Sequence, residues 1–303
     1  MRRVLTLASI FVLAGLRAWS ASDVELAFDF IHNQIVLRAM IEDRGPFNFV
    51  LDTGTYTSTI DTQLARELGL RLGPQRTVAG AGTARNPGQR TVCPELRLGD
   101  LVVHNLDAVA IDLAGMSEFL GRPLHGVLGF SFLSARAVRI DYFRRRIRFS
   151  DPDPSRPPSR SDDARFIAFP MVFRENSVLP VLQDCYVNGA RLPVTIDTGS
   201  SLGLILFPQA VEKLGLRELA RAGIPMQAGG YLGRARLTKG WATSVKLKTI
   251  DLGAIEVAYV QRGYGDTEQL ERRGGNLGNA VLQDFILTLD YPGRTVTLES
   301  TAE

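Results

Sequence analysis

Residues 46–55 read Pro-Phe-Asn-Phe-Val-Leu-Asp-Thr-Gly-Thr, and residues 193–200 read Pro-Val-Thr-Ile-Asp-Thr-Gly-Ser. In both stretches an apolar run leads directly into Asp-Thr-Gly. Such a run predicts a buried strand, and the glycine permits a tight turn immediately after it. Asp52 and Asp197 are therefore each expected at the end of a rigid support.

Three further pairs of segments repeat in the same order on either side of the middle of the chain. Residues 64–70 and 210–216 resemble each other as short helices ended by a glycine. Gly-Val-Leu-Gly at 126–129 matches Gly-Asn-Leu-Gly at 275–278, and Asp-Tyr recurs at 141–142 and 290–291. The offset grows slowly from 145 to 149 residues. This pattern predicts an internal duplication of one unit.

The predicted organisation is two lobes joined by a linker. Residues 150–164 are rich in Pro, Ser and Arg and predict a solvated linker between an N-terminal lobe at 21–149 and a C-terminal lobe at 165–303. Short apolar or alternating runs punctuated by Gly, Pro, Asn and Asp predict strands in both lobes. Helical periodicity is brief. We therefore expect a mostly β fold with one or two short helices in each lobe.

A pair of aspartates carried on two related turns has a definite chemical use. If pseudo-twofold symmetry brings the turns face to face, the two carboxyls share one proton, because two adjacent negative charges are costly. The ionised member can deprotonate a water while the protonated member donates to a carbonyl under attack. Thr53 and Thr198 are placed to hydrogen-bond across the axis. Thr55 and Ser200 are expected to donate to the outer carboxylate oxygens.

The Asp-Thr-Gly-Thr/Ser motif, followed after 74 or 78 residues by Gly-x-Leu-Gly, is similar to the pepsin and retropepsin superfamily of aspartic proteases. The closest likeness is to exported bacterial proteases of the retroviral type, and it spans about 24–149 and 165–300. The resemblance implies a bilobed fold of two pseudo-twofold-related β-barrel lobes with short helices. It implies catalytic aspartates at 52 and 197. The residues that it places in supporting roles are Thr53, Gly54, Thr55, Thr198, Gly199 and Ser200.

The resemblance also implies how the chain works as a whole. A single chain with both aspartates would be a monomer that acts as an intramolecular pseudo-dimer, and it would need water but no metal or cofactor. The apolar-Gly segments at 127–129 and 276–278 would pack behind the catalytic turns. Asn276 stands where the first copy has Val127, so we expect looser packing in the second segment.

The superfamily closes β-hairpin flaps over bound peptide. The flap candidates in this chain are Gly80 and Gly82 in the first half and Gly230 and Tyr231 in the second. Glycines suit mobile hairpin tips, but an ordinary surface turn is an equally good interpretation of both segments.

The formal net charge of +3 belongs entirely to the first twenty residues. Removing Arg2, Arg3 and Arg17 from the 35 basic residues leaves 32, against 32 acidic residues. The balanced remainder argues against a nucleic-acid partner. Residues 1–20 have a basic start, an apolar stretch and small residues before a cut after Ser20, which predicts a signal peptide and an exported, periplasmic or secreted protein. The alternative is an uncleaved N-terminal anchor; no other membrane contact is expected.

Two cysteines, Cys93 and Cys185, form either one disulfide or two buried thiols, and the sequence leaves both alternatives open.

The function predicted is that of an aspartic endopeptidase acting on peptides or unfolded proteins. The alternative is an exported protein that keeps the fold and binds extended peptide by strand addition without cutting it.

Overall fold

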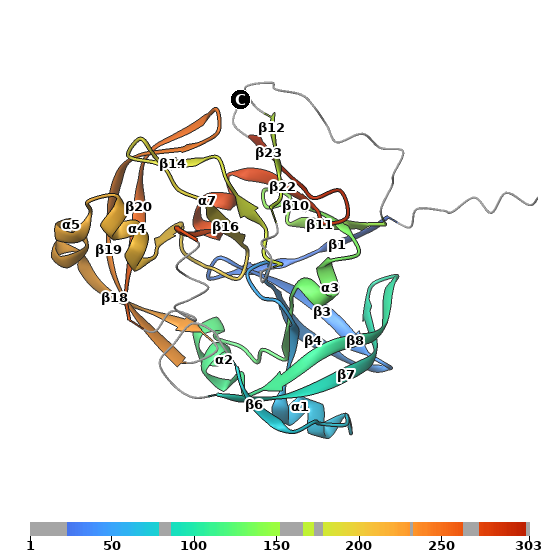
Figure 1. Ribbon diagram of the computed structural model, residues 1–303. Coiled ribbons are helices and arrows are strands. Elements are labelled where there is room, and N and C mark those ends of the chain that lie inside the picture. Colours follow the sequence, from blue (N-terminus) through green and yellow to red (C-terminus); the bar gives the residue numbers. More distant parts are fainter. Residues whose placement is uncertain are drawn as a thin grey trace, which may run out of the picture.

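The structure is a computed structural model that describes residues 23–78, 86–151, 166–172, 178–230, 233–262 and 273–300. It is mostly β, and its strands form two lobes and a third sheet that joins them (Figure 1). The predicted mostly β, bilobed fold is thus confirmed. The predicted signal peptide and nearly all of the predicted linker lie outside the described residues.

The N-terminal lobe is built on an eight-stranded sheet that curls back on itself, because β3 pairs with β7 as well as with its neighbours β2 and β4. Three short helices accompany it: α1 (Thr62–Glu67), α2 (Ala114–Leu120) and α3 (Phe130–Leu133). The strand order is β2 (Asp29–Ile31), β3 (Gln34–Ile41), β4 (Arg44–Leu51), β9 (Gly126–Leu128), β5 (Ser58–Asp61), β8 (Leu101–Ile111), β7 (Pro87–Leu98) and β6 (Gln75–Thr77).

The C-terminal lobe repeats this plan with a nine-stranded sheet. Its helices among the described residues are α4 (Pro208–Lys213), α5 (Arg217–Ala222) and α7 (Asn279–Leu282). The strand order is β13 (Val181–Leu182), β16 (Val194–Asp197), β21 (Gly275–Gly278), β17 (Leu204–Leu206), β20 (Ile250–Arg262), β19 (Gly233–Leu247), β14 (Cys185–Val187) and β15 (Ala190–Arg191), with β18 (Ile224–Gly230) paired to β19.

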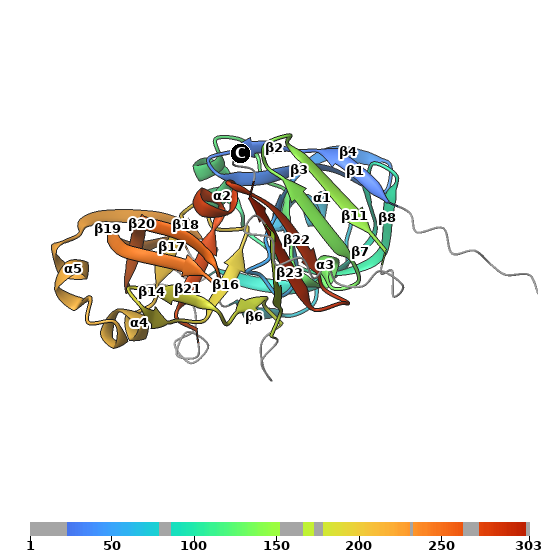
Figure 2. The same cartoon turned by 90° about the horizontal axis from the view of Figure 1, so that it is seen from above.

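A six-stranded sheet takes three strands from each half of the chain, and red β22 lies beside green β10 in both views (Figures 1 and 2). In the antiparallel β10–β22 pair, Arg139 lies opposite Thr288. These positions are 149 residues apart, the same offset that separates the two Gly-x-Leu-Gly motifs. The pseudo-twofold axis therefore passes through this pair. The strand order is β1 (Val24–Ala27), β11 (Arg146–Ser150), β10 (Ala137–Asp141), β22 (Phe285–Asp290), β23 (Thr295–Ser300) and β12 (Phe166–Pro170).

The helices show where local sequence signals act and where they fail. The Asp61 carboxylate accepts from the backbone N–H groups of Gln63 and Leu64 and so caps α1, as its position predicts. Gly69 and Gly215 follow α1 and α4 in the left-handed region, with φ of 71° and 66°.

The expectation of one or two helices in each lobe was too low: each half has three among the described residues. α3 and α7 have four residues each, too few to show a helical period.

Both cysteines are free and buried, on β7 and β14, so the disulfide alternative is wrong and the buried-thiol alternative is confirmed. Burial raises the pKa of the Cys93 thiol to about 11 and that of Cys185 to about 12, which keeps both protonated at neutral pH.

Within the described ranges, no helix is both long and apolar enough to cross a membrane.

Candidate active site

Each aspartate lies at the end of a strand that pairs with the Gly-x-Leu-Gly strand of its own half. β4 runs parallel to β9, and the Asp52 N–H donates to the Leu128 carbonyl at 3.0 Å. β16 runs parallel to β21, where Asp197 lies opposite Gly278. The two apolar-Gly segments therefore lie directly alongside the strands that carry the aspartates and fix where each turn begins.

Thr53 and Thr198 lock the two turns together across the axis. The Thr53 N–H donates to Thr198 Oγ1 at 3.1 Å, and the Thr198 N–H donates to Thr53 Oγ1 at 3.0 Å. Each hydroxyl in turn donates to a carbonyl of the opposite half, Thr53 to Ile196 at 2.7 Å and Thr198 to Leu51 at 2.9 Å. The hydrogen bonds that were predicted between these threonines are present, and both side chains are buried.

The two carboxylates lie over the glycine of the opposite turn. A Cβ atom on Gly54 would stand 2.6 Å from Asp197 Oδ1, and one on Gly199 would stand 2.2 Å from Asp52 Cγ. Atoms that are not bonded to each other do not come this close, so only glycine lets each carboxylate lie so near the other half. The glycines of the motif are thus a condition for bringing the acids together.

Backbone and side-chain donors hold the acids in place. The Gly54 N–H donates to Asp52 Oδ1 at 2.8 Å, and the Gly199 N–H donates to Asp197 Oδ1 at 3.0 Å. Asp52 is 8% exposed and Asp197 is 7% exposed. Burial and the charge of Asp52 raise the pKa of the Asp197 carboxyl well above its ordinary range, while the Arg273 charge opposes this shift. The pair is therefore set to share one proton.

The Ser200 hydroxyl has a partner other than the one expected. Its Oγ accepts from the Leu202 N–H at 3.4 Å, and the outer oxygen of Asp197 instead receives the Asn276 side-chain amide at 2.5 Å. Asn276 is 6% exposed and is thus buried, as Val127 is; the looser packing expected of the second segment stays a prediction. Sequence reasoning considered Asn276 only for its packing and missed its hydrogen bond to Asp197, although a polar side chain at a buried strand position, where the other copy has Val127, was a usable signal.

The Thr55 side chain packs at the start of α3. A Cβ atom on Gly129 would stand 2.6 Å from Thr55 Cγ2, and the Phe130 N–H donates to the Thr55 carbonyl at 2.9 Å. These contacts tie the first catalytic turn to the end of β9. The corresponding contact in the second half is the Asn279 N–H, which donates to the Ser200 carbonyl at 2.9 Å.

The residue after each Gly-x-Leu-Gly motif contacts the tyrosine of the opposite half. Asn279 accepts from the Tyr142 hydroxyl at 2.7 Å, and its amide donates to the carbonyls of Asn33 and Thr198, both at 2.7 Å. In the other half, the Phe130 ring meets Tyr291 edge-on, with ring centres 5.7 Å apart. The repeated Asp-Tyr motif thus supplies a side chain that braces the opposite half of the site.

Of the flap candidates, Gly80, Gly82 and Tyr231 lie outside the described residues. Gly230 ends β18 and pairs with Gly233 of β19, so it lies at the end of a hairpin. This hairpin reaches from the C-terminal lobe to α2 of the N-terminal lobe (Figure 1), where a Cβ on Gly229 would lie 3.7 Å from Phe119 Cβ. The flap role itself stays a prediction.

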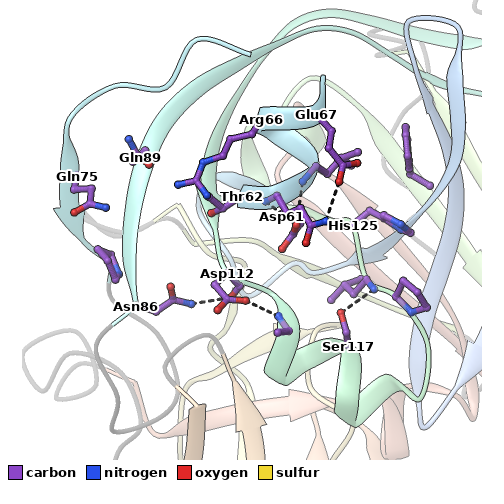
Figure 3. Close-up of a pocket in the computed structure, with 17 residues that line it drawn as sticks. Asp61, Thr62, Arg66, Glu67, Gln75, Asn86, Gln89, Asp112, Ser117 and His125 are labelled. Atoms are coloured by element: carbon purple, nitrogen blue, oxygen red, sulfur yellow. Dashed lines mark hydrogen bonds between the residues drawn. The ribbon is translucent and has the colours of Figure 1, made fainter. Parts of the chain in front are cut away.

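A cavity of about 850 Å³ lies in the N-terminal lobe between α1, α2 and the start of β7 (Figure 3). Neither Asp52 nor Asp197 lines it. Two of its carboxylates serve helix starts: Asp61 caps α1, and Asp112 Oδ1 accepts from the Ala114 N–H at 2.8 Å at the start of α2. The third, Glu67, accepts from the Gln63 side-chain amide at 2.9 Å. Among the described residues, no group of three or more His, Cys, Asp or Glu side chains is arranged to hold a metal ion.

A protein-family model described as "Aspartyl protease" matches residues 37–132 and 184–290. Each matched region contains one Asp-Thr-Gly turn and the Gly-x-Leu-Gly strand that flanks it. No curated protein matches the chain.

Proposed function

Because the chain belongs to the aspartyl protease family, we propose that it is an aspartic endopeptidase that hydrolyses peptide bonds with a water held between Asp52 and Asp197. The observation that carries this proposal is the close approach of the two buried carboxylates, each seated on the glycine of the opposite turn. The single chain would supply both halves of the site and act as an intramolecular pseudo-dimer.

In the first step, the two acids work in opposite senses. The Asp52 carboxylate removes a proton from the water, and the water oxygen forms a bond to the carbon of the scissile carbonyl. The Asp197 carboxyl donates its proton to the carbonyl oxygen, giving a neutral gem-diol. The raised pKa of Asp197 supports its assignment as the member that holds the proton.

In the second step, the gem-diol collapses. Asp52 gives the proton that it took from water to the amide nitrogen, and the carbon–nitrogen bond breaks. One gem-diol hydroxyl returns its proton to Asp197 as the new carboxylic acid forms. The products are a peptide acid and a peptide amine, and both aspartates end in their starting protonation states. No covalent intermediate with the enzyme forms.

The substrates proposed are peptides and unfolded proteins, which can lie extended between the lobes. We further propose that the protein acts after export, in the periplasm or outside the cell. The basic, apolar and small-residue pattern of residues 1–20 supports that location. An anchor made by the same segment would place the enzyme on the outer side of a membrane instead.

The test is hydrolysis of a denatured, fluorescently labelled protein and of a mixed peptide library between about pH 3 and 7, a range that brackets a carboxyl pair sharing one proton. Asp52→Asn and Asp197→Asn should each lower the rate by on the order of 10²–10⁴-fold, because each removes one proton-transfer group. A statine-containing peptide, which mimics the gem-diol, should inhibit. Asp100→Asn, in the exposed turn between β7 and β8, is the matched control and should leave the rate unchanged.

Hydrolysis that persists unchanged in Asp52→Asn would overturn the assignment. The alternative, a peptide-binding protein, has its own signature. The wild-type protein would then bind extended peptides in a fluorescence-polarisation assay and release them uncut after long incubation throughout the same pH range.

A further inference from the structure

The two halves of the site differ at one pair of facing strand positions. In the first half, Val127 of β9 lies opposite Val50 of β4. In the second half, the same register places Asn276 of β21 opposite Thr195 of β16. An apolar pair beneath one aspartate is thus a polar pair beneath the other, although the turns themselves are nearly identical.

The polar pair reaches the second aspartate directly. The Asn276 side-chain amide donates to Asp197 Oδ2 at 2.5 Å, while the Gly199 N–H donates to Asp197 Oδ1 at 3.0 Å. Both oxygens of Asp197 therefore accept from an N–H group. Behind them, Arg273 Nη1 donates to Thr195 Oγ1 at 3.3 Å.

The corresponding place in the first half is apolar. Val127 is fully buried and belongs to a cluster of aliphatic side chains, so the position opposite Val50 offers no donor to Asp52. The members of this buried cluster are Val36, Val50, Ile111, Leu113, Leu120, Leu124 and Val127.

We propose that Asn276 is a positioning residue of the site: its side-chain amide holds Oδ2 of Asp197 and eases release of the proton that this carboxyl carries. This inference rests on the proposed function, since it concerns the same two acids. The two carboxyls carry out the proton transfers of the reaction. The amide acts only through its hydrogen bond to Asp197.

The direction of the effect follows from the charge on Asp197. An N–H donor stabilises the ionised carboxylate more than the neutral acid, so the amide favours the charged form of Asp197. The other charged neighbours are Asp52, which opposes ionisation, and Arg273, which favours it. Tyr291 also faces Asp52, but burial and the Asp52 charge raise the pKa of its phenol, so it stays neutral. Without the amide, Asp197 should keep its proton to higher pH.

The first measurement is the pH dependence of kcat/KM for Asn276→Val, which recreates the apolar residue of the first half. The alkaline limb, where Asp197 loses the shared proton, should move to higher pH by about one pH unit. Asn276→Thr is nearly the same shape as valine but keeps a hydroxyl donor, and it should move the limb back toward the wild-type position. Val127→Ala disturbs packing at the matching position of the first half and should leave the limb in place.

The second measurement does not need activity. Carbon-13 labelling of the aspartate carboxyls gives the titration of Asp197 by NMR, with its signal identified from the spectrum of Asp197→Asn. The proposal is overturned if the Asp197 titration is the same in wild type and Asn276→Val, or if Val127→Ala moves it equally. If the titration shifts as expected but no variant or wild-type protein cuts peptides, Asn276 keeps its positioning role and the proposed protease function fails instead.

Discussion

At the scale of single residues, the threonines beside the two aspartates hold the two halves of the chain together. The hydroxyl of Thr53 donates to Ile196 and accepts from the Thr198 N–H, so one buried oxygen satisfies two backbone groups of the opposite lobe. Such groups are costly to leave without partners inside a protein. The threonine is therefore as much a requirement of the fold as of the chemistry.

Thr53→Val should lower the free energy of unfolding by about 2–4 kcal/mol, because it leaves the Ile196 carbonyl and the Thr198 N–H buried and unpaired. Urea denaturation measures this loss. Thr59→Val is the matched control: Thr59 is also buried, but its hydroxyl has no hydrogen-bond partner among the described residues. That variant should be neutral or slightly stabilising. Equal losses in both variants would show that the cost comes from core packing and not from the bonds across the axis.

The residues of the site could be predicted from the sequence as far as the duplication reached. Asp52, Asp197 and the two threonines stand at equal places in two copies, so symmetry alone brings them together. Asn276 was missed as a ligand of Asp197 because it breaks the symmetry. Its contact with Asp197 depends on which way a buried side chain points from β21, and one sequence does not show this.

At the scale of elements, the helices after the Gly-x-Leu-Gly strands connect each catalytic turn to the opposite half. α7 begins with Asn279, which is fully buried and hydrogen-bonds to Thr198, Asn33 and Tyr142. Two of these partners lie in the N-terminal half. A helix of four residues thus works mainly as a platform for one bridging side chain.

Asn279→Ala should cost about 3 kcal/mol of unfolding free energy, since it removes the donor to two buried carbonyls and the acceptor of the Tyr142 hydroxyl. Tyr142→Phe removes the hydroxyl alone and should cost about 1 kcal/mol. Chemical denaturation of the two variants gives the comparison. A loss in Tyr142→Phe as large as that in Asn279→Ala would contradict the bridging role assigned to the amide.

The elements that sequence patterns predicted well are short and apolar. β16, β22 and the second half of β4 fall on runs of mostly buried and mostly apolar residues, and β10 falls on an alternating run. The joining sheet was not predicted, because the pairing of β10 with β22 links segments about 150 residues apart and leaves no local pattern. Only the tip of the β18–β19 hairpin was named, as a flap candidate. The strand segments that flank this tip were not predicted, because Pro225 and several glycines interrupt them.

At the scale of the molecule, the lobes are not independent bodies joined by a chain. The joining sheet takes three strands from each half, and one continuous core contains buried side chains from both, such as Ile140 and Leu287, which face each other across the axis. The threonine contacts tie the same halves together at the site. This arrangement fixes the distance between two acids that are far apart in the sequence.

We therefore expect the two halves to unfold in one transition, with the calorimetric enthalpy equal to the van't Hoff enthalpy. Leu96→Ala in the N-terminal lobe and Leu247→Ala in the C-terminal lobe each empty a buried site, at a cost of about 2–5 kcal/mol. Each should lower the same single midpoint. Hydrogen exchange measured on peptides from both halves should then show that either variant speeds global opening in both. Two calorimetric transitions, of which Leu247→Ala moves only one, would instead mean that the joining sheet does not couple the lobes, and the geometry of the acid pair would have to be held by the threonines alone.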